Sequence, residues 1–445
     1  MRTWIVTVGA GIATAMGLAG CGSSTSPGDP PDAASEPDAP TTPDAKTGPA
    51  TFRRHTVATA ANGPAYVAVA QLGGKPTIVV SAFGHPTASL PAGTVKAFTP
   101  GADLDTWTSS TIVPDGDKVL FPNQPTLVDL DGDGDLDALV PSGFLVCAIP
   151  FIPGAGPCGA IAWYENAGTT WTRHELVTKQ DLFYHHAVLV DLDGDQQQDL
   201  VTVGETQAFM GPARAALQWF KGTASGVRFE TEPHTLAEGG GSFPRVADLD
   251  GDGDLDVASA EFFNSTASFV WFEHAGDAWT RHVIDDGAGP SIQLSVVDDA
   301  IGDGKLRLIG TNHVNTAKAT PDTHDSAVFM FDPPADPRDP WTRHTISDGI
   351  VSRPGAAMAP LGAPGIFGTG DLDGDGDLDV AVSGDGDEHV YWLEQTAPGV
   401  FATHVLEAKL GQAGGMVITD LDGDGKAEIV VTGYEDDVVY VYERE

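Results

Sequence analysis

Basic residues are scarce in this chain. Its 445 residues include 23 Lys and Arg against 63 Asp and Glu, which gives a formal net charge of −40. Nucleic-acid binding depends on clustered Lys and Arg that neutralise phosphates, and the sequence has no basic run long enough to form such a patch. The composition therefore argues against a nucleic-acid partner and suits a solvated surface.

The apolar run near the N-terminus is short. It extends from Trp4 to Ala19 after Arg2 and is rich in Gly and Ala, which is typical of a signal peptide and falls short of a membrane span. The run ends in "LAGC", which resembles a bacterial lipobox. Residues 1–20 are therefore predicted to be a lipoprotein signal peptide, with Cys21 as the lipid anchor of an exported outer-membrane or cell-surface protein. An ordinary cleaved signal peptide is the alternative.

Large apolar side chains are absent from residues 22–50, which are rich in Pro, Ser, Thr, Asp and Ala. A segment of this composition cannot bury a core. Residues 21–50 are therefore predicted to be a disordered, extended tether, and residues 51–445 are predicted to be the folded domain.

Cysteines and familiar catalytic motifs are also few. The sequence has no G-x-S-x-G elbow, no zinc-type His/Cys cluster and no phosphate-binding loop. Besides Cys21 it contains only Cys147 and Cys158, which close a short segment rich in Pro and Gly. In an exported protein such a pair is expected to form a disulfide; a redox or metal-binding role is the alternative.

The chain does contain a repeated acidic loop. "DLDGDGDLD" stands at 129–137, 248–256 and 371–379, and related loops start at Asp191 and Asp420. Degenerate copies start at Asp299 and Ala70, so that starts fall 49 to 72 residues apart. A regular period of this kind indicates an array of structural repeats.

Each repeat has the pattern of four short strands. Apolar, β-branched runs lead into and out of the acidic loop, a run such as "AWYEN" or "VWFEH" follows, and "WTRH" or a variant of it begins a closing strand. The last repeat ends at "VYVYERE" without a closing strand, while "FRRHTV" at Phe52 has no repeat before it. The sequence therefore predicts an all-β, seven-bladed β-propeller over 51–445, closed by an N-terminal strand that completes the last blade.

These motifs resemble the FG-GAP/VCBS repeats of bacterial β-propellers, which are related to the integrin α-chain head. The resemblance covers nearly all of the chain after the tether. It implies a calcium-binding propeller and is poorly specific for activity.

The spacing of acids in the loop indicates a cation site. An EF-hand would need a Glu at position 12, where the first loop has Val140. Position 9 carries a carboxylate instead, so the predicted ligands are Asp129, Asp131, Asp133 and Asp137, with the carbonyl of Asp135. Oxygen ligands without His or Cys favour Ca²⁺; an acidic turn without metal is the alternative.

The same spacing predicts calcium in the other loops, as a structural staple. Position 6 is a glycine in four of the loops, whereas Gln196 occupies it in the loop from Asp191 and puts the affinity of that site in doubt. The further predicted ligands are Asp248, Asp250, Asp252, Asp254 and Asp256; Asp371, Asp373, Asp375, Asp377 and Asp379; Asp191, Asp193, Asp195 and Asp199; and Asp420, Asp422, Asp424, Lys426 (carbonyl) and Glu428.

The face opposite the acidic loops is the expected place for ligand binding, because the loops there vary between repeats. Histidines that recur in the closing strands are expected to be structural. The pair His185 and His186 occurs once, and is interpreted as a loop pair held by carbonyls or, alternatively, as a base or proton relay. The candidate ligand-binding residues are Tyr184, His185, His186, Arg245, Glu205, Glu261 and His313.

Two classes of function compete. The first is a non-enzymatic surface lipoprotein, a monomer that binds a glycan, particularly an acidic one, or a protein. The second is a carbohydrate-active enzyme, since some relatives resemble polysaccharide lyases and sugar dehydratases. In that case Arg245 would neutralise a uronate, and His185, His186 or Tyr184 would act as base and acid. A purely structural envelope protein is a third possibility, and the fold alone does not decide between them.

Overall fold

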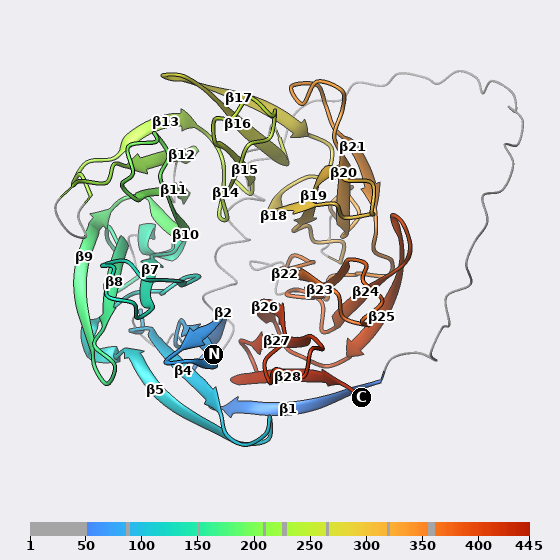
Figure 1. Ribbon diagram of the computed structural model, residues 1–445, viewed down its shortest axis with the longest axis horizontal. Helices are drawn as coiled ribbons and strands as arrows, with labels where there is room; N and C mark the ends of the chain where they lie inside the picture. The colour runs from blue at the N-terminus through green and yellow to red at the C-terminus, as the bar shows by residue number, and fades with distance from the viewer. Residues whose placement is uncertain are drawn as a thin grey trace, which may run out of the picture.

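The structure is a computed structural model that describes residues 51–85, 90–149, 152–207, 211–224, 229–263, 267–317, 321–354 and 361–445. Seven four-stranded antiparallel sheets are arranged in a ring (Figure 1). We number these blades 1 to 7 in chain order, and within blades 1 to 6 the strands are paired in sequence order. The ring confirms the predicted seven-bladed, all-β propeller.

Short strands rich in Val, Ile, Ala and aromatic residues form every blade, as the β-propensity of these residues favours. Blade 1 consists of β2 (Pro64–Leu72), β3 (Lys75–Ala82), β4 (Thr94–Pro100) and β5 (Trp107–Val113). Blade 2 consists of β6 (Thr126–Val128), β7 (Asp137–Ser142), β8 (Gly159–Asn166) and β9 (Trp171–Gln180). Blade 3 consists of β10 (Phe183–Val190), β11 (Asp199–Gln207), β12 (Ala213–Phe220) and β13 (His234–Glu238). Blade 4 consists of β14 (Arg245–Ala247), β15 (Asp256–Ala260), β16 (Phe269–Ala275) and β17 (Ala278–Asp285). Blade 5 consists of β18 (Ser291–Asp298), β19 (Leu306–Asn312), β20 (Val328–Asp332) and β21 (Thr342–Thr345). Blade 6 consists of β22 (Phe367–Gly370), β23 (Asp379–Ser383), β24 (Val390–Ala397) and β25 (Val400–Glu407). The described helices are two 3-10 turns, η2 (Asp115–Asp117) and η3 (Leu145–Ala148).

Blade 7 combines the two ends of the domain. It consists of β26 (Ala413–Thr419), β27 (Glu428–Gly433), β28 (Val438–Arg444) and β1 (Phe52–Thr59), which pairs antiparallel with β28. The closing-strand pattern at Phe52 thus supplies the outer strand that the last repeat lacks, as predicted. With β1 in place, every blade of the ring has four strands (Figure 1).

The hydrophobic core is divided among the blade interfaces. Seven buried clusters each draw residues from two neighbouring blades, and an eighth lies at the face where first strands begin. Blades 4 and 5, for example, pack Phe269 and Trp271 against Leu308 and Phe331, all fully buried. Each blade is therefore stable only against its neighbours, as expected for a repeat architecture.

The recurring histidines support the blades, as expected. In blade 2, the Nε2 atom of His174 lies 2.8 Å from Glu165, and the imidazole stacks on Trp163 with ring centroids 4.3 Å apart. The same cross-strand arrangement recurs at His282 and His404, which stack on Trp271 and Trp392 and pair with Glu273 and Glu394.

The predicted signal peptide, the lipidation site Cys21 and the tether lie outside the described residues. Within the part of the chain that the structure covers, none of the helices has the length and apolar character needed to cross a membrane.

Candidate metal loops and ligand-binding cavity

The acidic loops join the first and second strands of blades 2, 3, 4, 6 and 7, so they lie together on one face of the ring. In each loop, carboxylate oxygens from positions 1, 3 and 9 lie within 4.8 Å of one another. In blade 2 these residues are Asp129, Asp131 and Asp137. Three convergent carboxylates form a donor set that suits a hard divalent cation.

The remaining predicted ligands lie in the same loops but outside these groups of three. The position 5 carboxylates of Asp133, Asp252 and Asp375 each accept a hydrogen bond from the backbone N–H of position 7, at 2.9 to 3.0 Å. Position 1 shapes the turn, since Asp129 accepts hydrogen bonds from the N–H groups of Gly132 and Gly134. The loop backbone is therefore held in place by its own side chains.

The position 9 carboxylate is buried and anchors the loop to the third strand. Asp256 is inaccessible to solvent and accepts hydrogen bonds from the N–H groups of Leu249 and His274, both at 2.9 Å. Burial raises the pKa of Asp256 to about 6 and the pKa values of Asp379 and Glu428 to about 7, and the neighbouring loop carboxylates add to this rise. A bound cation would relieve the cost of burying these charges.

The opposite face contains a cavity of about 150 Å³ to which every blade contributes. First strands begin there and second strands end there. The lining residues include, in blade order, Tyr66, Phe144, His185, Phe263, His313, Asp385 and Tyr434. We call this space the mouth cavity. No Lys or Arg lines it among the described residues.

The walls of the mouth cavity are largely aromatic. Phe83 makes ring contacts with Tyr66 at 5.8 Å and with Phe144 at 5.9 Å, and Phe262 lies 5.0 Å from Phe263. Phe144, Phe262 and Phe263 remain partly exposed. Such a concave apolar surface with few polar groups is typical of a ligand-binding site.

Two histidines of the mouth cavity face carboxylates. The Nδ1 atom of His185 lies 3.5 Å from Glu205, which is inaccessible to solvent and accepts a hydrogen bond from Ser242 at 3.0 Å. The Nε2 atom of His313 lies 3.6 Å from Asp385, whose pKa is raised by burial. These pairs bring imidazoles and carboxylates together at the cavity.

The structure places the other candidate residues of this face elsewhere. Tyr184 is buried between blades, where its hydroxyl donates to Gln218 at 3.1 Å, and burial raises its pKa. Glu261 is buried and pairs with Arg281 at 2.7 Å. His186 and Arg245 line a separate cavity deeper in the ring, so the arginine expected at an acid-binding mouth does not reach it.

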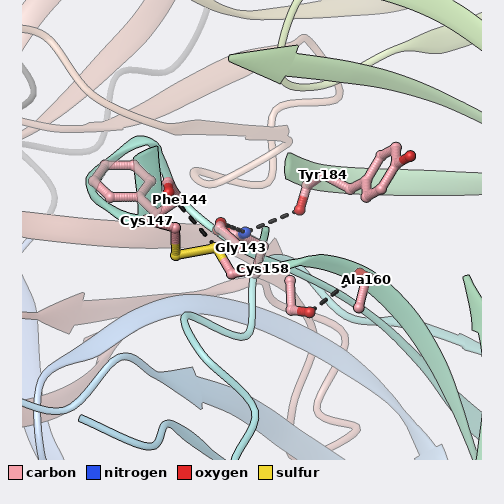
Figure 2. The surroundings of a disulfide bond; sticks show 8 residues. Gly143, Phe144, Cys147, Cys158, Ala160 and Tyr184 are labelled. Carbon is pink, nitrogen blue, oxygen red and sulfur yellow. Dashed lines mark hydrogen bonds between the residues drawn. A yellow bond between two sulfur atoms is a disulfide. The ribbon is translucent and has the colours of Figure 1, made fainter. Parts of the chain in front are cut away.

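A disulfide joins Cys147 and Cys158 and fixes one wall of the mouth cavity (Figure 2). The bridge starts at Cys147, three residues after Phe144, which lines the cavity together with Leu145. Asn123 adds a second restraint, since its amide donates hydrogen bonds to the carbonyls of Gly143 and Tyr184 at 2.8 and 2.9 Å. The bridge therefore has a structural role in positioning the Phe144 wall.

Comparison with known families gives a match over two stretches that contain four of the five acidic loops. A profile of FG-GAP-like repeats matches residues 191–259 and 371–431. The chain contains FG-GAP-like repeats. This confirms the resemblance that the loop and strand motifs indicated, and none of the curated proteins compared matches the chain.

Solved structures show likeness to this chain at low sequence identity. An α-L-arabinanase of Penicillium chrysogenum complexed with arabinobiose is 11% identical with a TM-score of 0.45, and the match covers 88% of this chain and 98% of that one. A virginiamycin B lyase of Staphylococcus aureus is 13% identical with a TM-score of 0.46, covering 88% of this chain and 99% of that one. Likeness at this level says nothing about what the FG-GAP-like propeller binds.

In blade 5, an internal cation takes part in the degenerate loop that starts at Asp299. Arg307 stands at position 9, where the intact loops have a carboxylate, and it is almost fully buried. Its guanidinium contacts Asp303 at 2.6 and 2.9 Å and Asp332 at 2.6 Å. The loop thus keeps its turn without a metal-binding group of carboxylates, because an arginine supplies the positive charge.

In blade 3, a lysine enters the FG-GAP-like loop itself. The ammonium of Lys221 contacts the carboxylates of Asp193 and Asp195, and these contacts raise its pKa. Gln196 has a φ of 70°, a left-handed conformation that costs a non-glycine residue about 1–2 kcal/mol. In "QWFKG" this lysine stands where "AWYEN" and "VWFEH" have Glu, a signal from which its role could have been predicted.

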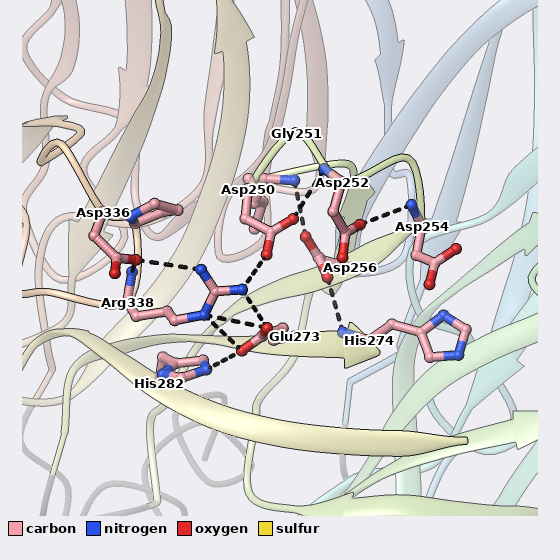
Figure 3. Close-up of polar contacts among 12 residues, drawn as sticks. Asp250, Gly251, Asp252, Asp254, Asp256, Glu273, His274, His282, Asp336 and Arg338 are labelled. Carbon is pink, nitrogen blue, oxygen red and sulfur yellow. Dashed lines mark hydrogen bonds and ion pairs between the residues drawn. The ribbon is translucent and has the colours of Figure 1, made fainter. Parts of the chain in front are cut away.

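Blade 4 receives a cation from its neighbour (Figure 3). Arg338, between β20 and β21 of blade 5, reaches Asp250 at 2.6 Å and also contacts Glu273 and Asp336. Asp250 belongs to the carboxylate group of the blade 4 loop. The guanidinium therefore links two blades at an FG-GAP-like loop while leaving Asp248 and Asp256 without an arginine contact.

Replacing Lys221 should tighten cation binding by the blade 3 loop. We expect Lys221→Met to increase its calcium affinity about three- to tenfold, equivalent to roughly 0.7–1.4 kcal/mol, because the ammonium no longer competes for Asp193 and Asp195. Calorimetric titration of residues 51–445 with calcium measures this change in the weakest class of sites. As a control, Lys409→Met, on the connection from β25 to β26, should leave the titration unchanged; equal effects of the two variants would contradict the prediction.

Proposed function

We propose that this chain is an exported, lipid-anchored, calcium-binding β-propeller that acts as a non-enzymatic binding module for a glycan or a protein partner. Calcium in the acidic loops stabilises one face, and the ligand binds in the mouth cavity on the other. The observation that supports this proposal is the convergence of all seven blades on one aromatic cavity. A rigid ring that presents variable loops around a concave site is a common arrangement for binding.

The lining of the mouth cavity favours a neutral or apolar ligand group. Aromatic faces pack well against the apolar face of a sugar ring or against an aliphatic or aromatic side chain of a protein. Asp385 lines the cavity, whereas no Lys or Arg among the described residues does. An acidic sugar would meet no compensating charge there, so a neutral glycan is the better candidate.

A carbohydrate-active enzyme is the second candidate. The pairs His185–Glu205 and His313–Asp385 place imidazoles and carboxylates at one cavity. Such groups could act as base and acid in a lyase or dehydratase reaction. Their separations of 3.5 and 3.6 Å exceed those of well-formed hydrogen bonds, and no further catalytic motif accompanies them, so binding remains the preferred function.

A binding and degradation assay separates the two functions. Residues 51–445 with calcium are mixed with neutral and acidic polysaccharides, and the length of each polysaccharide is followed by size-exclusion chromatography. We expect a neutral polysaccharide to keep its length and to co-elute with the protein. Shortened chains would overturn the proposal in favour of the enzyme, and loss of the shortening in His185→Asn would assign it to the cavity.

A cavity variant tests the location of binding. Phe263→Ala removes a partly exposed ring from the mouth cavity and should weaken co-elution at least tenfold. Val405→Ala, at an exposed position in β25, is the matched control and should bind like the parent. If no polysaccharide binds either protein, a glycan is excluded as the ligand. A protein partner can then be sought as a protein that binds the parent but not Phe263→Ala.

A further inference from the structure

A second cavity, of about 250 Å³, lies in the central channel of the ring. Its lining comes from the first strands of blades 2 to 7 and the residues just before them, and it includes Gln124, His186, Arg245 and Ser295. Several neighbouring first strands contact one another around this channel, for example β2 with β26 and β22 with β26, and Figure 1 shows β10, β14, β18, β22 and β26 around the centre. We call this space the channel cavity.

Arg245 is a cation without a counter-ion in the channel cavity. The hydrogen bond of its guanidinium runs from Nη1 to the carbonyl of Pro244, at 3.4 Å, and no carboxylate of the described residues pairs with it. The internal stretches outside the described residues contain no Asp or Glu, so they cannot supply a partner either. Burial alone lowers the pKa of Arg245 to about 10.

The guanidinium of Arg245 is partly buried in the channel cavity and has no charged partner among the described residues. Buried charges in proteins are normally paired, because removing a charge from water without compensation destabilises the fold by several kcal/mol. This chain has 63 acids, and its other buried or half-buried arginines, such as Arg281 and Arg307, pair with them. Among the described residues Arg245 is the exception, and an anion bound in the channel cavity would supply the missing negative charge.

The surroundings of Arg245 fit a small anion with one negative charge. Burial, together with the charge of Arg245, lowers the pKa of His186 to about 3, so His186 is neutral and Arg245 is the single charge to be balanced. The Nδ1 atom of His186 has no hydrogen-bond partner. The amide nitrogens of Gln124 and Gln293 are engaged by the carbonyls of Val67 and Phe367 at 2.8 and 3.0 Å, so the guanidinium remains the principal donor.

Phe243 separates the channel cavity from the mouth cavity. It is buried, and its ring lies 5.8 Å from Tyr66 and 6.1 Å from His185 of the mouth cavity, but also 6.2 Å from His186 of the channel cavity. A glycan or protein side chain in the mouth cavity would stop at this ring. A ligand of Arg245 is therefore distinct from a ligand of the mouth cavity.

We propose that the central channel contains a binding site for a small monovalent anion, either a halide or a one-carbon to two-carbon carboxylate, with Arg245 as its principal ligand. The anion neutralises the guanidinium, and its charge lies at the axis of the ring, where it stabilises the packing of the first strands. This site is independent of the proposed mouth ligand and of the acidic loops.

Anion-dependent stability tests this site. Residues 51–445 with calcium are melted in sodium bromide, in sodium formate and in a bulky sulfonate salt, at one ionic strength. We expect bromide or formate at about tenfold over the dissociation constant to raise the melting temperature by roughly 2 °C, with saturation. A rise with bromide alone defines a halide site, and a rise with both defines a site that also takes carboxylates. No rise with either overturns the proposal.

Variants and anomalous scattering locate the anion. Arg245→Met should abolish the saturable rise, whereas Arg214→Met, at an exposed arginine in β12, should retain it. If Arg245→Met does not fold, Arg245→Lys keeps the charge without the planar fork and should reduce the response. In crystals grown with bromide, an anomalous peak at the guanidinium supports the proposal; a saturable rise that persists in Arg245→Met, or bromide peaks only elsewhere, overturns it.

Discussion

Chelation of calcium should lower the melting temperature of residues 51–445 by more than about 10 °C. Calcium at about 100-fold over its dissociation constant stabilises a fold by roughly 2.7 kcal/mol per site, and five loops bring three carboxylates within 4.8 Å of one another. The sum is comparable to the whole stability of a typical domain, about 5–15 kcal/mol. Melting curves with calcium, with EDTA and after re-addition of calcium or magnesium measure the effect, and calcium should restore more than magnesium does.

The stability of the metal-free protein and that of the calcium-bound protein should depend on pH in opposite ways, which provides a check on this interpretation. Without metal, burial holds the pKa values of Asp256, Asp379 and Glu428 at about 6 to 7, well above their unfolded values near 4. The folded state then binds more protons than the unfolded state between these limits, so the metal-free protein should become more stable as the pH falls from 8 to 5. The calcium-bound protein should become less stable over the same range, because protons compete with calcium. An unchanged melting temperature in EDTA would show that the loops contribute no metal-dependent stability.

The fold could be predicted because its determinants are local and repeated. The acidic loop, the run two strands later and the "WTRH" strand recur at similar spacing, and each blade packs only against its neighbours. One misread repeat, such as the degenerate one at Asp299, does not change the count of the others. The unpaired "FRRHTV" strand then leaves ring closure as the natural solution.

The positions of single side chains on the opposite face could not be predicted in the same way. Tyr184, His185 and His186 are consecutive, yet they point to a blade interface, to the mouth cavity and to the channel cavity respectively. The direction of each depends on the register shift between Tyr184 and Ala187 in the pairing of β10 with β11. Since one residue of register reverses the face of a side chain, sequence alone does not fix which cavity Arg245 or His186 reaches.

Substitutions within the repeated loops and strands are easier to interpret from the sequence than the side chains of the opposite face. Arg307 and Lys221 stand at positions where other repeats have carboxylates, and both bring a positive charge to the loop carboxylates. Alignment of the repeats with one another is therefore informative about which loops have a positive charge supplied by the chain itself. It separates blade 5, whose charge is balanced internally, from blades 2, 6 and 7.

Deletion of β1 should destroy the stability of the ring. A chain that starts at residue 61 loses the pairing of β1 with β28, from Phe52↔Arg444 to Thr59↔Val438. Each lost hydrogen bond contributes about 0.5–1.5 kcal/mol, and the buried side chains of Val57 and His55 are lost with them. We therefore expect this chain to be insoluble or to melt at least about 15 °C lower, measured against a chain that starts at residue 51.

The cause of this loss can be isolated by adding the strand back. A synthetic peptide of residues 51–60 should bind the shortened chain by β-strand addition at the open edge of β28 and recover part of the lost melting temperature. A peptide with Val57→Asp is the matched control, because it retains the backbone hydrogen bonds but cannot fill the core between blades 7 and 1. If the shortened chain melts like the longer one, ring closure by β1 contributes little, and the interfaces between the other blades suffice to hold the ring.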